Sequence, residues 1–189
     1  MSLFAELGMR YPIIQAPMAG VQNTELAMAV TGAGALGSLP AAMLSTAELR
    51  KALELLAVSG PGPFNINFFC HRQSEPDPVE EQRWREALAP YYAEFGVDAR
   101  AETTAPGRAP FNAEHAALLG EFRPAVVSFH FGLPAPELLA RVKATGASVF
   151  ASATTVAEAH WLARHGVKAA HEVTLTEYGL KKRYGQDAP

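Results

Sequence analysis

Short apolar segments of strand length alternate with helical patterns along most of this chain, and no other feature constrains the fold as much. The candidate strands lie at residues 13–16, 35–39, 64–69, 125–131, 148–152 and 167–170. Most of them are apolar on both faces, which is typical of buried parallel strands. The last three begin roughly 20 residues apart, which is the spacing of repeated βα units.

The segments between the candidate strands carry helix start and stop signals. Asn23, Ser45, Asn112 and Thr155 each precede a helical pattern as N-cap residues, and Pro136 marks the first turn of another. Ser45 and Thr155 are each followed three residues later by a glutamate, which predicts a capping box. Glycines follow most of these patterns, as they do at helix ends.

One stretch departs from this rhythm. From residue 71 to 112 the chain is polar and rich in proline, and it contains a helical pattern at 79–95 despite Pro90. We interpret it as an excursion after the third strand of a domain that covers residues 1–171. Excursions of this length often serve as lids or binding loops.

Alternating βα units fold either as an open doubly wound sheet or as a barrel. A nucleotide site of the first kind needs G-x-G-x-x-G after the first strand. Residues 32–37 match that string, but they follow a helix and precede a strand. We therefore reject them as a phosphate loop and expect a (β/α)8-type barrel. The chain has six candidate strands, so we expect the barrel to be truncated after about six.

Composition excludes several classes of function. The net charge is −3, and no Lys/Arg cluster occurs beside aromatic residues, so we expect no nucleic-acid partner. We expect no membrane association, because no apolar run reaches the length of a membrane helix, and no signal peptide pattern is present. Cys70 is the single cysteine, which excludes an internal disulfide and favours a cytoplasmic location. It lies next to His71, but one Cys and one His do not make a metal site.

The first candidate strand ends in an informative loop. Residues 12–20 read P-I-I-Q-A-P-M-A-G, so a short strand meets Pro17 and then Gly20. Such a loop leaves little side chain to obstruct a flat ligand.

This segment resembles the opening motif of nitronate monooxygenases, also called 2-nitropropane dioxygenases. Four later segments resemble further motifs of that family in the same order, and the resemblance covers residues 1 to about 170. They are G-A-L-G-S-L at 34–39, F-N-I-N-F-F at 64–69, S-F-H-F-G-L-P at 128–134 and S-A-T-T at 152–155.

The resemblance implies an FMN-dependent barrel enzyme that oxidises alkyl nitronates with O2 to a carbonyl compound and nitrite. It places Ala16, Pro17 and Met18 against the flavin ring and Asn67 at a flavin edge. It also places His130 on the substrate side of the flavin, which makes His130 the candidate catalytic residue. Ser152 is a further candidate flavin contact.

The residues themselves leave other readings open. Asn67 reads equally well as a buried amide satisfied by neighbouring backbone, and Met18 as core filler. Ser152 can simply end the fifth strand, and without the motif His130 reads as a core histidine. The remaining histidines have no motif support and are interpreted as surface or element-end residues: His71, His115, His160, His165 and His171.

The sequence departs from the family pattern after the sixth candidate strand. The glycine-rich segment G-G-H-R-G, which carries the histidine usually assigned as catalytic base in the family, does not occur here. We interpret residues 172–189 as a tail unlike the family. Two alternatives to a nitronate monooxygenase therefore stand. One is a related flavin-dependent NAD(P)H:quinone or enoyl reductase. The other is a non-catalytic fragment that binds no flavin and persists by self-association or with a partner chain that supplies the rest.

Overall fold

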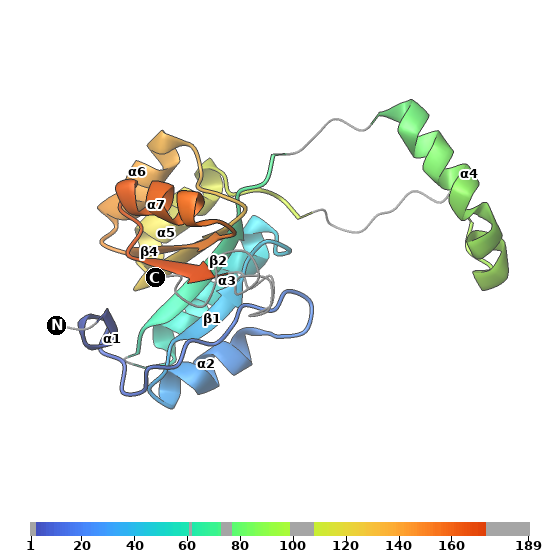
Figure 1. Cartoon of the computed structure of the whole chain (residues 1–189). Helices are drawn as coiled ribbons and strands as arrows, with labels where there is room; N and C mark the ends of the chain where they lie inside the picture. Colours follow the sequence, from blue (N-terminus) through green and yellow to red (C-terminus); the bar gives the residue numbers. More distant parts are fainter. Residues whose placement is uncertain (1–2, 61, 73–76, 99–107, 173–189) are drawn as a thin grey trace, which may run out of the picture. The chain divides into compact units, whose positions relative to one another are not determined.

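The computed structural model describes residues 3–60, 62–72, 77–98 and 108–172 of the chain. Its centre is a parallel sheet in which five strands follow one another in chain order (Figure 1). The strands are β1 (Gly37–Pro40), β2 (Phe64–Phe69), β3 (Val126–His130), β4 (Ser148–Ala153) and β5 (Ala169–Glu172). A doubly wound sheet reverses its strand order at a switch point, whereas this sheet shows the uninterrupted order of a (β/α)8-type barrel wall. The fold class predicted from the sequence is therefore confirmed.

The predicted helices form where their caps indicated. They are α2 (Thr24–Gly32), α3 (Thr46–Val58), α4 (Pro78–Phe95), α5 (Ala113–Phe122), α6 (Pro136–Ala144) and α7 (Val156–Arg164). A further short helix, α1 (Leu3–Glu6), was not predicted. Asn23, Ser45, Asn112 and Thr155 each accept a backbone N–H of the first turn that follows. The carboxylate of Glu158 differs from the expected capping box, because it accepts from the N–H and hydroxyl of Thr154.

The two faces of the sheet are covered differently. One face packs against the helices in the main hydrophobic core, which includes Ile66 and Phe68 of β2. On the other face, Val126 and Phe150 pack with Leu36 and with Met9 of the N-terminal segment. Because strand side chains alternate between faces, the helix-covered residues leave Asn65 and Asn67 of β2 on the opposite, interior face of the barrel wall.

The first predicted strand, at residues 13–16, is reduced to a single parallel bridge between Ile14 and Leu36. Gln15 N–H donates to Leu36 C=O, and Leu36 N–H donates to Ile13 C=O, each at 3.0 Å. The next step of this parallel ladder needs an N–H from residue 17, and Pro17 has none. The boundaries of two other strands also differ from the prediction. β1 begins two residues later than predicted, and β5 spans residues 169–172 rather than 167–170.

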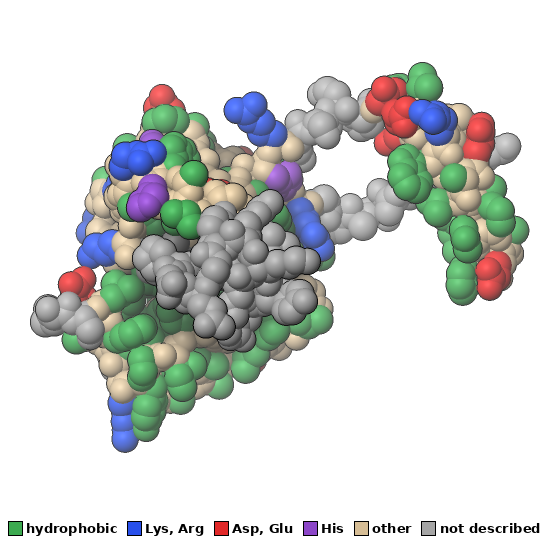
Figure 2. All heavy atoms as spheres, in the orientation of Figure 1, with side chains coloured by type: hydrophobic (Ala, Val, Ile, Leu, Met, Phe, Trp, Pro, Cys, Tyr) green, Lys and Arg blue, Asp and Glu red, His purple; other side chains and the backbone are tan. Residues whose placement is uncertain are grey.

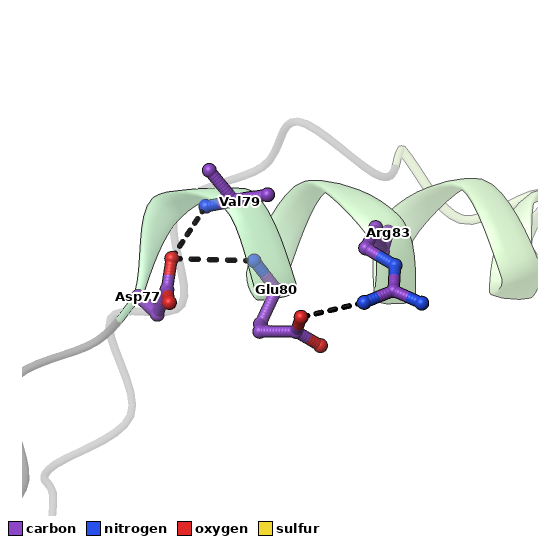
Figure 3. A network of polar contacts seen from close by, with 4 residues as sticks. All are labelled: Asp77, Val79, Glu80 and Arg83. Atoms are coloured by element: carbon purple, nitrogen blue, oxygen red, sulfur yellow. Dashed lines mark hydrogen bonds and ion pairs between the residues drawn. The ribbon is translucent and has the colours of Figure 1, made fainter.

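The excursion forms a compact unit of its own, residues 72–107, within the predicted range of 71–112. Its helix α4 is capped by Asp77, whose Oδ1 accepts from Val79 N at 2.9 Å and from Glu80 N at 3.4 Å (Figure 3). Arg83 donates to the Glu80 carboxylate at 2.6 Å in the same turn. Pro90 is accommodated within α4. No residue of this helix is buried, and apolar and acidic side chains share its surface (Figure 2).

The predicted tail, residues 172–189, lies outside the described residues apart from Glu172, which ends β5. None of the helices in the described part of the chain is long and apolar enough to cross a lipid bilayer.

Candidate active site at the carboxyl ends of the strands

A pocket of about 310 Å³ opens at the carboxyl ends of β1 to β4, where barrel enzymes place their active sites. Its lining is mostly apolar, with an amide, an imidazole, two hydroxyls and one carboxylate. The lining residues are Pro17, Ala19, Pro40, Asn67, Phe69, His130, Phe131, Ser152, Thr154 and Glu158. Four of the six site residues predicted from the sequence are among them.

Asn67 forms part of the pocket lining from a buried position on β2. It is opposite Ser128 in the β2–β3 register, and its Nδ2 donates to the Ser128 hydroxyl at 2.9 Å. This bond fixes the orientation of the amide within the pocket wall. An amide carries donors and an acceptor together, so a fixed amide can pair with a polar ring edge. Ser152, also buried, lines the same pocket from β4.

A second buried asparagine was not singled out from the sequence. Asn65 Nδ2 donates to the Ser38 hydroxyl at 3.1 Å, but Asn65 Oδ1 is buried without a hydrogen-bond partner among the described residues. A buried acceptor left in this state costs about 1–3 kcal/mol. The only available sequence signal was its spacing two residues before Asn67, which places both amides on one strand face.

Aromatic rings surround His130 at the pocket mouth. The ring of Phe69 lies 6.0 Å from His130, 5.0 Å from Phe131 and 6.2 Å from His71, measured between centroids. Phe131 has a φ of 67°, a left-handed conformation that is unusual for a bulky residue. Such strained positions gather at functional sites. Neither Phe131 nor the contact of His71 with this cluster was predicted from the sequence.

The loop after Gln15 supplies one wall of the pocket through Pro17 and Ala19. The predicted flavin contacts Ala16 and Met18 are exposed and are not among the lining residues. The loop therefore presents alternate residues to the pocket. A contact through the backbone of Ala16 or Met18 stays a prediction.

The one carboxylate in the described lining of the pocket is hydrogen-bonded, and the Cys70 thiol packs against the helix-covered core rather than lining the pocket. The Glu158 carboxylate accepts from Thr154 N at 2.7 Å and from its hydroxyl at 2.9 Å. Burial raises the pKa of the Cys70 thiol to about 12, so it is protonated at neutral pH. No group of three or more metal-ligating side chains occurs in the described residues.

The interpretation of His115 as a surface or element-end residue was incomplete, because the structure buries it at the start of α5. Its Nδ1 accepts the N–H of Asn112 at 3.3 Å, and its ring lies 5.1 Å from Phe68 and 5.8 Å from Phe111. Burial lowers the pKa of His115, which favours the neutral ring that this bond needs. His115 is therefore a structural residue of the helix-covered core.

Sequential parallel strands with a pocket at their carboxyl ends define the class as a βα-barrel protein with an enzyme-type site. The sequence pattern of the nitronate monooxygenase family matches residues 2–173, and this chain belongs to that family.

Curated relatives show the same membership. The nitronate monooxygenase of Paraburkholderia phytofirmans is 41% identical over 189 residues, covering 99% of this chain and 51% of the relative. That of Pseudomonas aeruginosa is 40% identical over 173 residues, covering 86% of this chain and 47% of the relative. The chain thus spans about half the length of the curated relatives it matches. The alignment with the Paraburkholderia protein also extends beyond residue 173, where the family pattern ends.

Solved structures share the fold. A nitroalkane oxidase from Streptomyces ansochromogenes superposes with a TM-score of 0.72 at 31% identity, covering 89% of this chain and 47% of that one. FabK from Thermotoga maritima superposes with a TM-score of 0.59 at 22% identity, covering 87% of this chain and 40% of that one. The second likeness shows the fold alone.

Proposed function

We propose that this chain carries the ring-binding part of an FMN-dependent nitronate monooxygenase, which oxidises alkyl nitronates with O2 to a carbonyl compound and nitrite. One observation carries the proposal. Pro17, Asn67, His130 and Ser152 come from four separate sequence segments and line a single pocket at the catalytic end of the barrel wall. Family membership and the likeness to a nitroalkane oxidase support it.

The pocket suits the ring of a flavin. Pro17, Ala19 and Pro40 provide a wall of small or flat side chains, and Asn67 adds a fixed amide. These residues would hold the isoalloxazine ring by apolar contact and by hydrogen bonding at its edge. When bound, FMN supplies the redox chemistry, because it can accept electrons from a nitronate and pass them to O2.

The phosphate of FMN has no cationic partner in this lining. No Lys or Arg is among the described residues that form the pocket, and its one charged side chain is Glu158. We therefore propose that the phosphate is held by residues outside the described lining. Barrel enzymes commonly place that site in the loops after strands seven and eight.

His130 is the proposed substrate-binding group. A nitronate is an anion, so an imidazole N–H within an apolar pocket can orient it through a charge-assisted hydrogen bond. The rings of Phe69 and Phe131 lie 6.0 Å and 6.1 Å from the ring of His130, and apolar neighbours of this kind strengthen such a bond. In this role His130 positions the nitro group against the ring site.

The test measures flavin and product in the same purified fractions. We expect the fluorescence of FMN to be quenched when FMN is mixed with the chain. We also expect nitrite to form from propionate 3-nitronate or an alkyl nitronate. His130→Asn should slow nitrite release while the melting temperature and the FMN affinity stay close to wild type. Oxidation of NADH by a quinone without nitrite release would instead support the reductase alternative.

The association state and location belong to the same proposal. We propose that the chain acts in the cytoplasm, as its single half-buried thiol allows, and that it self-associates through sheet edges. Size-exclusion chromatography with light scattering tests the second point, since a monomer at micromolar concentration would contradict it. If the eluted chain carries no flavin and releases no nitrite, the fragment alternative would be supported.

A further inference from the structure

The loop that carries Pro17 and Ala19 is bonded to β1 by side chains. These side chains take the place of the backbone hydrogen bonds with which a parallel sheet would otherwise continue. After the bridge between Ile14 and Leu36, the next step of a parallel ladder would use both backbone groups of Ser38. Ser38 N–H would donate to the carbonyl of residue 15, and Ser38 C=O would accept from the N–H of residue 17. Pro17 has no N–H, so the buried Ser38 carbonyl needs another donor.

Two glutamine side chains replace that step. Gln15 Oε1 accepts the N–H of Ser38 at 3.2 Å, and Gln15 Nε2 lies 3.4 Å from the Ser38 carbonyl oxygen. Gln22 Nε2 makes a shorter bond to the same carbonyl oxygen. The Oε1 of Gln22 accepts the N–H of Met18 at 3.0 Å. One planar amide therefore joins the loop to β1, which is the connection that Pro17 prevents the backbone from making.

The backbone on either side of Gln22 is anchored independently. Val21 N–H donates to Met18 C=O at 3.3 Å, which closes a tight turn with Gly20 at a φ of 84°. Asn23 caps α2 by accepting from Leu26 N at 3.3 Å. Gln22 is thus fixed at the start of a helix while its side chain reaches across to the loop and the strand.

We infer that Gln22 is a positioning residue, which sets the distance of the Pro17–Ala19 wall from the rest of the pocket. Met18, whose N–H it holds, lies between the two lining residues of that wall. Where the inference concerns FMN it rests on the proposed function. The loop geometry stands without it.

The test uses Gln22→Met in the full chain, because methionine keeps the length of the side chain and removes both hydrogen bonds. Amide exchange of Met18, measured by NMR, should accelerate by roughly three- to tenfold, the range expected for one lost hydrogen bond. The matched control is Gln82→Met on α4, where the glutamine donates to the exposed Glu86. The control should leave Met18 exchange unchanged, and neither variant should shift the melting temperature by more than a few degrees.

A second readout is titration with FMN followed by fluorescence. Gln22→Met should weaken binding severalfold relative to both the wild type and Gln82→Met. Met18 exchange that equals the wild-type rate would overturn the inference, as would faster exchange with unchanged FMN affinity. If the wild-type chain binds no FMN, the proposed function fails, and the exchange rates alone still decide whether Gln22 holds the loop.

Discussion

The carbonyl oxygen of Ala27 occupies the space that a side chain on Gly37 would need. A Cβ built on Gly37 would lie 2.1 Å from that oxygen and 2.5 Å from the hydroxyl of Thr31. Helix α2 therefore rests directly on the first residue of β1. This close approach sets the position of the strand whose Pro40 lines the pocket.

Gly37→Ala should consequently be severely destabilising, by about 3 kcal/mol or more, because backbone atoms of α2 must move. Gly32→Ala is the matched control, since a Cβ there meets nothing within 4 Å and its φ is not positive. The control should be neutral or up to about 1 kcal/mol more stable, as alanine favours helix. Urea unfolding of both variants measures the difference. Equal midpoints would contradict the packing argument.

The bond between Asn67 and Ser128 allows stability and ligand binding to be separated. Asn67→Ala and Ser128→Ala each remove this buried bond, and each should lose about 1–3 kcal/mol of unfolding free energy. Only Asn67→Ala also removes the amide from the pocket. Its FMN affinity should fall on the order of tenfold beyond that of Ser128→Ala, and indistinguishable affinities would refute the role of Asn67 at the flavin edge.

His115 should make the stability of the chain depend on pH. Burial lowers its pKa from the ordinary value of 6.5, with Glu114 acting weakly in the opposite direction. The unfolded chain therefore takes up a proton before the folded chain does. The contribution of His115 is complete above about pH 6.5 and declines as the pH falls from there towards the lowered folded pKa.

His115→Gln provides the comparison, because glutamine at this position can keep the capping contact with Asn112 but does not titrate. The wild type should lose more unfolding free energy between pH 7.5 and pH 5.5 than this variant. Parallel pH profiles would show that His115 is not a neutral, bonded ring in the folded state.

We expect the ring of Phe131 to support nitronate turnover, although its backbone conformation is strained and destabilises the fold. Its φ of 67° is disfavoured for a bulky residue, by roughly 1–2 kcal/mol, and the residue is 64% exposed, so the fold gains little from it. Phe131→Gly should leave the melting temperature unchanged or raise it, while nitronate turnover falls because the ring beside His130 is lost. A clear drop in melting temperature with normal turnover would make Phe131 a structural residue.

Local signals in the sequence were sufficient to predict most of the elements. Asn23, Ser45 and Asn112 cap helices through contacts within one turn, so residues two or three positions apart carry the whole signal. The short, largely apolar runs at β2 and β4 likewise predict buried strands from residues that are adjacent in the chain. The βα alternation then restricts the topology, and the motifs pointed to Pro17, Asn67, His130 and Ser152.

The tertiary structure decided the features that depend on distant partners. The strand at 13–16 became one bridge because the donor that Ser38 requires is missing at Pro17, and Gln22 took its place. His115 is buried because Phe68 and Phe111, which belong to other segments, enclose its ring. A sequence determines which groups a chain has and which short-range bonds they favour. Burial and the pairing of polar groups across the sheet depend on packing between segments, so only the folded chain fixes them.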